Sequence, residues 1–437
     1  MSTVRIRGAI AALTDHERTV LFDRATSSDL QVQARTAAII QQVRDGGDAA
    51  LRALAAQYDN VVLGALEVPR ARWARALDAL DPALRQSLER AARNIRTAHE
   101  AFRPITREVE TEPGIVIGRR PDPLGRVGIY APGGRATYPS SLLMGAIPAR
   151  VAGVGEVIVC SPPGADGVPS DVVLAAAALA GVDRVFALGG AGAIAAMALG
   201  TASVPRVDRI VGPGNAYVAE AKVQLVGSVA IDAPAGPSEL LVIADESAQP
   251  DDIARELVAQ AEHDPRAAVV AVIIGDALAD AVAHALDAAV TRTPRAEIVR
   301  ASLAACGAIV TARDLDEAVT FANRYAAEHL QLQLADDRVD AVLAALRNAG
   351  TVFVGASASV AYGDYMTGAN HVLPTGGLAR AYSGLSTLDF VRWTTTQRVS
   401  REAAARLADD VGRFADAEGL PGHAAAARAW ARAEVQA

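Results

Sequence analysis

Eight short apolar runs separated by alanine-rich helical patterns constrain the fold of this chain more than any other feature of its sequence. The runs are residues 126–130, 156–159, 184–187, 209–211, 239–243, 268–274, 308–310 and 351–354. Continuous apolar runs joined through helices are typical of parallel strands that are buried on both faces. Because eight strands exceed one small sheet and 437 residues exceed one ordinary core, the sequence predicts two α/β globules with parallel sheets. One large continuous sheet is the alternative.

The segments at the two ends of the chain have helical patterns. From about residue 28 to residue 110, alanine, leucine and arginine recur at three- and four-residue intervals, and the tail from about residue 400 is also rich in alanine and arginine. The most apolar stretch, residues 267–290, is interrupted by Asp276, Asp280 and Asp287, which excludes a membrane span. That stretch predicts a strand, a turn at Gly275-Asp276, and an amphipathic helix.

Charge and cysteine content narrow the functional classes. The formal net charge is −8, and acidic and basic residues are interspersed without a Lys/Arg run. A nucleic-acid-binding face would need a basic stripe, so the sequence argues against that class. We expect Cys160 and Cys306 to be reduced thiols of a cytoplasmic protein, with one disulfide as the alternative. Residues 1–10 lack the apolar core of a signal peptide, which favours the same location.

Glycine-rich turns follow three of the expected strands. They are Gly133-Gly134, residues 189–195 and residues 212–215. Glycine at such a turn lets the backbone approach a pyrophosphate, and the following helix N-terminus supplies donors. Gly190-x-Gly192-x-x-Ala195 fits the dinucleotide fingerprint, but no acidic residue ends the next strand, so an ordinary turn explains this match equally well. Three such turns in one globule favour a bound nucleotide.

Three polar clusters carry the candidate chemistry. Glu328 and His329 stand side by side at the expected end of a helix; Gln260 and His263 share a helix face; and Asp364 lies in a glycine-flanked segment. Together these residue types offer general bases and ligands for zinc. Each cluster also has a structural explanation, namely a histidine at a helix C-terminus or an aspartate that stabilises a turn. Their spacing leaves open whether they converge.

Several long motifs in one order resemble the histidinol dehydrogenase family over nearly the whole chain. They are residues 126–134, 212–218, 234–239, 260–263, 328–330, 363–365 and 370–375. The resemblance implies two NAD-dependent oxidations, from L-histidinol through L-histidinaldehyde to L-histidine, the final steps of histidine biosynthesis. It also implies a cytoplasmic homodimer of intertwined chains with shared active sites, and no nucleic-acid or membrane partner.

The resemblance also assigns roles to individual residues. His329 would take the alcohol proton, and Glu328 would activate a water for attack on the aldehyde. One Zn²⁺ per chain would be bound by Gln260, His263, Asp364 and His423. The substrate would contact Ser238, Gln260, His263, His329, Asp364, Glu418 and His423. Glu418 and His423 would come from the partner chain, and Tyr130 and Asn215 would line the NAD site.

The family resemblance implies two incomplete Rossmann-like globules with terminal extensions. The expected division begins with an N-terminal extension, 1–27. A first globule would comprise 28–129, 239–320 and 354–385, and a second, NAD-binding globule would comprise 130–238 and 321–353. A helical C-terminal tail, 386–437, would reach the partner chain.

The sequence departs from the family pattern at two places. Gly192 stands where the family usually has glutamine, which weakens one NAD contact, and Ser359-Val360-Ala361 stands where Pro-Glu-Ser is common, which bears on the support of Asp364. The alternatives to histidinol oxidation are a paralogous dehydrogenase of another polar alcohol, a zinc hydrolase and an inactive homologue. Glu418 and His423 argue against another substrate, and the intact Glu328-His329 pair argues against inactivity.

Overall fold

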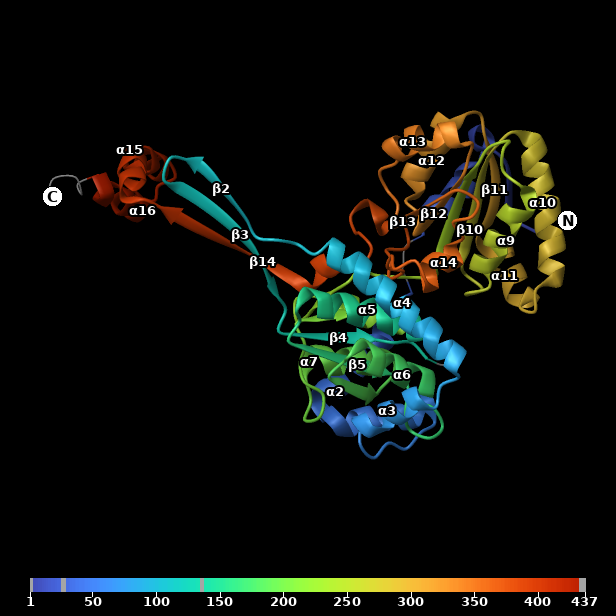
Figure 1. Ribbon diagram of the computed structural model, residues 1–437, viewed down its shortest axis with the longest axis horizontal. Helices are drawn as coiled ribbons and strands as arrows, with labels where there is room; N and C mark the ends of the chain where they lie inside the picture. Colours follow the sequence, from blue (N-terminus) through green and yellow to red (C-terminus); the bar gives the residue numbers. More distant parts are fainter. Residues whose placement is uncertain (1–2, 25–28, 134–136, 432–437) are drawn as a thin grey trace. The chain divides into compact units, whose positions relative to one another are not determined.

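The computed structural model describes residues 3–24, 29–133 and 137–431 and divides into two units (Figure 1). The first unit comprises Met1–Phe102 and Leu124–Phe390, and the second comprises Arg103–Pro123 and Val391–Ala437. The first unit contains two parallel sheets, of six and five strands. The prediction of two parallel sheets rather than one large continuous sheet is therefore confirmed.

The six-stranded sheet has the strand order β1-β11-β10-β9-β12-β13. In that order its strands are Ile6–Ala9, Gly307–Ala312, Ala268–Ile274, Glu239–Ala244, His329–Gln333 and Thr351–Val354. Side chains along β9 alternate between two cores: Leu240 and Val242 belong to one, and Leu241 and Ile243 belong to the other. This period of two explains why the strand is apolar at every one of these positions.

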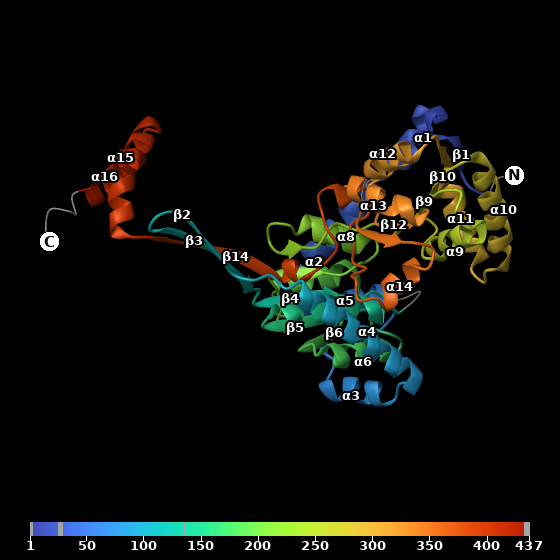
Figure 2. The same cartoon turned by 45° about the horizontal axis from the view of Figure 1, so that its top comes forward.

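Helices cover both faces of this sheet, as Figures 1 and 2 show. One core contains residues of α9 (Pro250–Ala261), α10 (Asp276–Arg292) and α11 (Ala296–Cys306). The other contains residues of α1 (Asp15–Phe22), α12 (Leu315–Tyr325) and α13 (Asp336–Ala345). The predicted strand, turn and amphipathic helix in residues 267–290 are confirmed as β10, Gly275 and α10. No helix in the described part of the chain is long and apolar enough to cross a membrane.

The five-stranded sheet has the strand order β6-β5-β4-β7-β8. In that order its strands are Arg184–Ala187, Glu156–Ser161, Arg126–Tyr130, Arg209–Val211 and Ala230–Ile231. Around it lie α5 (Pro139–Ala152), α6 (Asp171–Ala180), α7 (Gly190–Leu199) and α8 (Ala216–Gln224). A further layer is formed by α2 (Leu30–Leu54), α3 (Arg70–Asp78) and α4 (Pro82–Ala101), which pack on α7 and α8, on α6, and on α5.

Two glycines have clear roles in this helical layer. Gly47 has φ +50° and interrupts the regular geometry of α2. A Cβ atom at Gly192 would lie 3.0 Å from Leu54 Cδ1. The absence of a side chain at Gly192 therefore lets α7 pack closely on α2.

The remaining short elements connect these layers. They are α14 (Val360–Tyr365), η1 (Ile10–Ala12), η2 (Ala55–Asp59), η3 (Leu378–Arg380) and η4 (Thr387–Phe390).

The observed division differs from the expected one in three places of the first unit. Residues 1–27 were expected as an N-terminal extension, but β1 pairs with β11 in the six-stranded sheet. Residues 321–353 were expected in the second globule, but β12 and β13 pair beside β9 in the six-stranded sheet. Residues 28–129 were expected with the first globule, but α2, α3 and α4 pack on helices of the five-stranded sheet. Backbone pairing along β9 and β11 and helix packing on α5 to α8 decide these positions, and neither is visible in the local pattern.

The second unit combines an antiparallel sheet with a helical pair. Its sheet has the order β14-β3-β2, formed by Val391–Val399, Ile115–Pro123 and Arg107–Glu112. Helices α15 (Arg401–Ala417) and α16 (Pro421–Arg428) pack on each other. The prediction of a wholly helical tail from residue 386 is therefore wrong at β14, an exposed strand that carries no continuous apolar run.

A buried ion pair anchors the turn after β7. Lys222, the only lysine of the chain, lies in α8, and its Nζ donates to Gly212 O (2.6 Å) and Asp232 Oδ1 (2.5 Å). The backbone N–H of Gly212 donates to Asp232 Oδ2 (2.7 Å). Gly212 has φ +112°, and a Cβ there would meet Tyr130 O at 2.2 Å. The pair therefore holds both polar backbone groups of a residue that only glycine can fill.

Replacement of Lys222 by methionine should destabilise the protein. The Asp232 carboxylate would stay buried without its cation, which costs about 3 kcal/mol or more of unfolding free energy. Urea unfolding measures this loss. The control is Arg313→Met, which removes an exposed ion pair with Asp314 and should cost at most about 1 kcal/mol. Equal losses in the two variants would contradict the anchoring role.

Candidate active site

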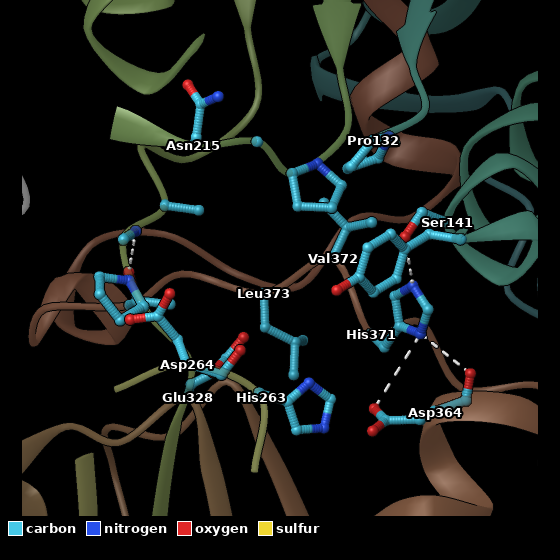
Figure 3. Close-up of a pocket in the computed structure, with 18 of the residues that line it drawn as sticks. Pro132, Ser141, Asn215, His263, Asp264, Glu328, Asp364, His371, Val372 and Leu373 are labelled. Atoms are coloured by element: carbon cyan, nitrogen blue, oxygen red, sulfur yellow. Dashed lines mark hydrogen bonds and ion pairs between the residues drawn. The ribbon is translucent and has the colours of Figure 1, made fainter. Parts of the chain in front are cut away.

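A cavity of about 640 Å³ in the first unit is lined by residues from the ends of both sheets (Figure 3). The five-stranded sheet contributes the turns after β4 and β7, and the six-stranded sheet contributes the segments before β9 and β12. Helices α5, α9 and α14 supply further walls. A concave site with several converging polar groups is the usual form of a small-molecule site.

On the five-stranded side the cavity lies at the carboxyl edge of the sheet. Tyr130 ends β4 and Asn215 follows β7, which is the neighbouring strand. After β4 the chain adds β5 and β6 on one side and then crosses to β7 on the other. The cavity therefore lies at the topological switch point, where open α/β sheets bind nucleotides.

The two expected nucleotide contacts are held by helix starts. The Tyr130 hydroxyl accepts a hydrogen bond from the N–H of Gly190 (3.0 Å), at the start of α7. Burial raises the pKa of Tyr130 to about 12, so its phenol stays protonated. Asn215 Oδ1 accepts from the N–H groups of Tyr217 and Val218 and caps α8. Both residues line the cavity.

On the six-stranded side the cavity lies at the amino edge. Ser238 immediately precedes β9, Glu328 immediately precedes β12, and the first residue of β12, His329, pairs with Leu240. Glu328-His329 is therefore a strand start; α12 ends earlier, at Tyr325, with Ala326 in the left-handed conformation. Because α9 follows β9 and leads into the parallel strand β10, its C-terminal end returns to the amino edge and brings Gln260 and His263 to the cavity.

Glu328 and His329 are both buried and share one backbone partner. The Glu239 N–H donates to Glu328 Oε2 (2.7 Å), and His329 Nδ1 lies 2.9 Å from the carbonyl oxygen of Glu239. His329 Nδ1 also lies 3.4 Å from Glu328 Oε2. A carbonyl oxygen only accepts, so Nδ1 carries a proton and donates it to Glu239. In the neutral ring the lone pair is then on Nε2.

His329 lines the cavity, and its Nε2 is an available acceptor. It is a buried atom without a hydrogen-bond partner among the described residues, and Asp364 Oδ1 lies 3.8 Å away. A buried polar atom with no partner is uncommon in a folded protein. A general base has this arrangement, because its basic nitrogen must be open to the group from which it takes a proton.

Burial and neighbouring charges shift the pKa values of Glu328 and His329. Burial alone would lower the pKa of His329, but the carboxylates of Glu328 and Asp364 outweigh burial and raise it to about 9. Burial raises the pKa of the Glu328 carboxyl, against the attraction of His329. At neutral pH the pair therefore holds a proton that must leave before His329 can act as a base.

Asp364 is placed by packing on both sides of its short helix. A Cβ at Gly363 would meet the Phe353 ring at 2.5 Å, and a Cβ at Gly368 would meet Asn94 O at 2.5 Å, so both glycines allow close contact. At the start of α14, the N–H of Val360 donates to the buried Glu256 (3.0 Å). These contacts support Asp364 in the segment that departs from the family pattern.

His371 belongs to the site although the sequence did not assign it a role. Its Nδ1 lies 2.9 Å from the backbone oxygen of Asp364, and its Nε2 lies 3.2 Å from Ser141 Oγ (Figure 3). Burial lowers the pKa of His371, against the carboxylate of Asp364. A neutral ring therefore donates to Asp364 and accepts from Ser141. His371 lies within the motif of residues 370–375, whereas nothing in the sequence indicated Ser141.

Three of the four expected zinc ligands lie at this cavity. Gln260, His263 and Asp364 line it, and Gln260 is almost completely buried. An amide oxygen, an imidazole and a carboxylate form a mixed N/O donor set that suits zinc. Within the described part of one chain, no group of three His, Cys, Asp or Glu residues could hold a metal ion. The donor set fits zinc, but it needs a further ligand from outside this cavity wall.

The expected tail residues lie in the second unit. Glu418 is at the C-terminal end of α15 and His423 is in α16, and both are exposed. Their role at a partner's cavity stays a prediction. Gly134, in one of the expected glycine turns, lies outside the described residues. Gly192 is absent from the described cavity lining and packs on Leu54.

Comparisons with known proteins agree over nearly the whole chain. A family model described as histidinol dehydrogenase matches residues 22–430. The histidinol dehydrogenase of Halobacterium salinarum is 49% identical over 418 residues, which cover 95% of this chain and 97% of the relative. That of Xylella fastidiosa is 48% identical over 396 residues, covering 90% of this chain and 91% of the relative.

A solved structure gives the same result for the fold. The crystal structure of histidinol dehydrogenase from Elizabethkingia anophelis is similar with a TM-score of 0.93 at 30% sequence identity. The similarity covers 99% of both chains.

Proposed function

The chain belongs to the histidinol dehydrogenase family of NAD-linked oxidoreductases, and from this premise we propose that the cavity of the first unit is its active site. The reaction is the two-step oxidation of L-histidinol through L-histidinaldehyde to L-histidine, at the end of histidine biosynthesis. The observation that carries the proposal is the unpartnered Nε2 of His329, a residue that lines the cavity beside the buried Glu328 carboxylate.

In the first oxidation an alcohol loses a proton from oxygen and a hydride from carbon. His329 Nε2 accepts the proton, while its Nδ1–H stays hydrogen-bonded to Glu239 and keeps the ring oriented. NAD supplies the hydride acceptor. Its binding at the turns of Tyr130 and Asn215 is supported by the switch point between β4 and β7.

In the second oxidation Glu328 accepts a proton from a water whose oxygen adds to the aldehyde carbon. The resulting hydrate then loses a hydride from carbon, and His329 again accepts a proton from oxygen. Glu328 suits this role because it is buried next to His329 and is fixed by the Glu239 amide. Buried carboxylates with raised pKa values are better bases than exposed ones.

Gln260, His263 and Asp364 of this chain would hold one Zn²⁺ together with His423 of the partner subunit. When bound, zinc supplies a Lewis acid that fixes the imidazole and amine of the substrate. Ser238 and the partner's Glu418 complete the substrate contacts. Ser238 lines the cavity, and Glu418 is exposed in the second unit, where a second copy can reach it.

A homodimer with shared sites is supported by the surface of the second unit. Phe414, Trp430 and Val411 expose large apolar areas there, and a groove of about 520 Å³ is lined by Val399, Leu407 and neighbouring residues. Exposed apolar patches of this kind mark interaction sites. Cytoplasmic location is supported by Cys160 and Cys306, which are both free thiols.

The first prediction from this site separates the base from the metal ligands. With NAD and zinc, the wild type should form two NADH per L-histidinol. His329→Asn should lower kcat by about 10²- to 10⁴-fold, the range for loss of a general base, and keep its zinc. The matched variant His263→Asn should lose zinc. Metal content by mass spectrometry and NADH absorbance measure both; zinc loss in His329→Asn would contradict the assignment.

The raised pKa of His329 predicts an alkaline pH dependence. The active form is unprotonated, so the rate of the first oxidation should rise with pH, with an apparent midpoint above the ordinary pKa of histidine because the Glu328 carboxylate raises the pKa of His329. Glu328→Gln removes a carboxylate that raises this pKa, so the midpoint should move to lower pH. Single-turnover NADH formation from pH 6 to 10 measures it. Asp264→Asn, another carboxylate of the cavity, is the control and should leave the midpoint in place.

Shared active sites predict complementation between two inactive variants. His329→Asn damages the cavity, and His423→Ala damages the tail. A purified mixed dimer has one site with both parts intact and should regain about half of the wild-type kcat per dimer. Differently tagged chains allow isolation of mixed dimers. Two His329→Asn chains with the same tags are the control, and no gain in verified mixed dimers would refute shared sites.

A further inference from the structure

Both proposed catalytic side chains depend on the backbone of Glu239. Its N–H holds the Glu328 carboxylate and its carbonyl oxygen holds the His329 imidazole, at 2.7 and 2.9 Å. Glu239 begins β9, beside the start of β12, and the register of His329 with Leu240 brings the three residues together. A shift of this one backbone position would move the base and the carboxylate at the same time.

The side chain of Glu239 is fixed by a buried arginine. Arg24 Nε lies 2.9 Å from Glu239 Oε1, and Arg24 Nη2 lies 3.2 Å from Oε2, a two-point contact. The side chains are only 10% and 4% exposed. Glu239 Oε1 also accepts from the N–H of Gly376 (2.8 Å). Such two-point pairing fixes orientation as well as charge.

Arg24 also holds the segment that leads into Glu328. Its Nη2 donates to the carbonyl oxygen of Tyr325 (2.7 Å), the last residue of α12, and its guanidinium lies 3.5 Å from the centre of the Tyr325 ring. Its Nη1 donates to Leu21 O (2.6 Å). One guanidinium therefore joins the start of β9 to the end of α12, three residues before Glu328.

We propose that Arg24 and Glu239 are positioning residues: their ion pair fixes the backbone that orients Glu328 and His329 for both oxidations. The proposal rests on the function proposed for that pair. Stability alone explains the Arg24–Glu239 contact less well. The rest of β9 is apolar, and a buried ion pair stabilises a protein little more than apolar side chains at the same positions would. The backbone of Glu239 contacts both Glu328 and His329, so the ion pair determines where these two side chains lie.

The test compares a double variant with single variants. Arg24→Met/Glu239→Gln removes both charges together, so no buried charge is left unpaired, and glutamine can still accept from Gly376. If the pair positions the site, the folded double variant should lose roughly 10- to 100-fold in kcat, the scale of a small misplacement. Its KM for NAD should stay within about twofold, because the NAD turns belong to the other sheet.

Further measurements exclude a merely structural effect. The deuterium isotope effect on kcat, measured with histidinol deuterated at the alcohol carbon, should increase as hydride transfer becomes slower. Arg24→Lys keeps the charge but offers a point contact, so its kcat should lie between the double variant and wild type. If the double variant does not fold, Arg24→Lys with its isotope effect decides: an unchanged kcat and isotope effect would overturn the proposal.

A control ion pair lies at the other end of the same strand. Asp245 directly follows β9 and pairs with Arg338 (2.9 Å), away from the described cavity lining. Arg338→Met/Asp245→Asn should change the unfolding temperature but leave kcat unchanged. His329→Asn separates the two hypotheses. If it keeps wild-type kcat, the proposed function fails; if it is inactive while the folded double variant keeps wild-type kcat and isotope effect, only the positioning role fails.

Discussion

The register between β9 and β12 is the constraint on which the site depends. His329 is paired with Leu240, so Glu328 and Glu239 face each other where the two strands begin. A slip of one residue would turn His329 to the opposite face of the sheet. Gly350, which precedes β13 on the other side of β12, allows the backbone to lie close to Glu328, because a Cβ at this position would lie 2.5 Å from Glu328 O. Strand pairing therefore sets the geometry of the proposed catalytic pair before any ligand binds.

The two sheets contribute opposite edges to one cavity. The five-stranded sheet follows the rule for open α/β folds, since the turns of Tyr130 and Asn215 lie at its carboxyl edge. The six-stranded sheet does not follow it, since Ser238 and His329 lie at strand starts. Short turns after strands suit a phosphate-rich cofactor. Strand starts held by neighbouring strands suit residues that must keep a fixed orientation, because the ladder leaves their backbone little freedom.

The sequence predicted the strands that are continuously apolar and missed strands that carry polar residues. All eight continuous apolar runs are strands, and most of their residues are buried; at the sheet edge, Val354 of β13 is exposed. The strand β12 escaped prediction because Gln331 and Gln333 are fully buried yet hydrogen-bonded to each other (2.9 Å), so a core strand reads as polar. The family resemblance could identify candidate site residues that lie within sequence motifs. The Arg24–Glu239 contact was not, because the two residues are distant in the chain and meet only after folding.

Two buried ion pairs act in the same way on the two sides of the cavity. Lys222 and Asp232 hold the N–H and carbonyl of Gly212, next to the proposed NAD turn. Arg24 and Glu239 hold the backbone beside the proposed catalytic pair, Glu328 and His329.

The two cations are not interchangeable. The Lys222 ammonium fits between one carbonyl and one carboxylate oxygen, whereas the planar guanidinium of Arg24 can bind a carboxylate at two points and also donate to Tyr325 O. Apart from histidine, the other basic residues of the chain are arginines, and its single lysine lies where a compact cation is needed. Because a buried pair gives little net stability, its consequence here is a fixed backbone at each wall of the site.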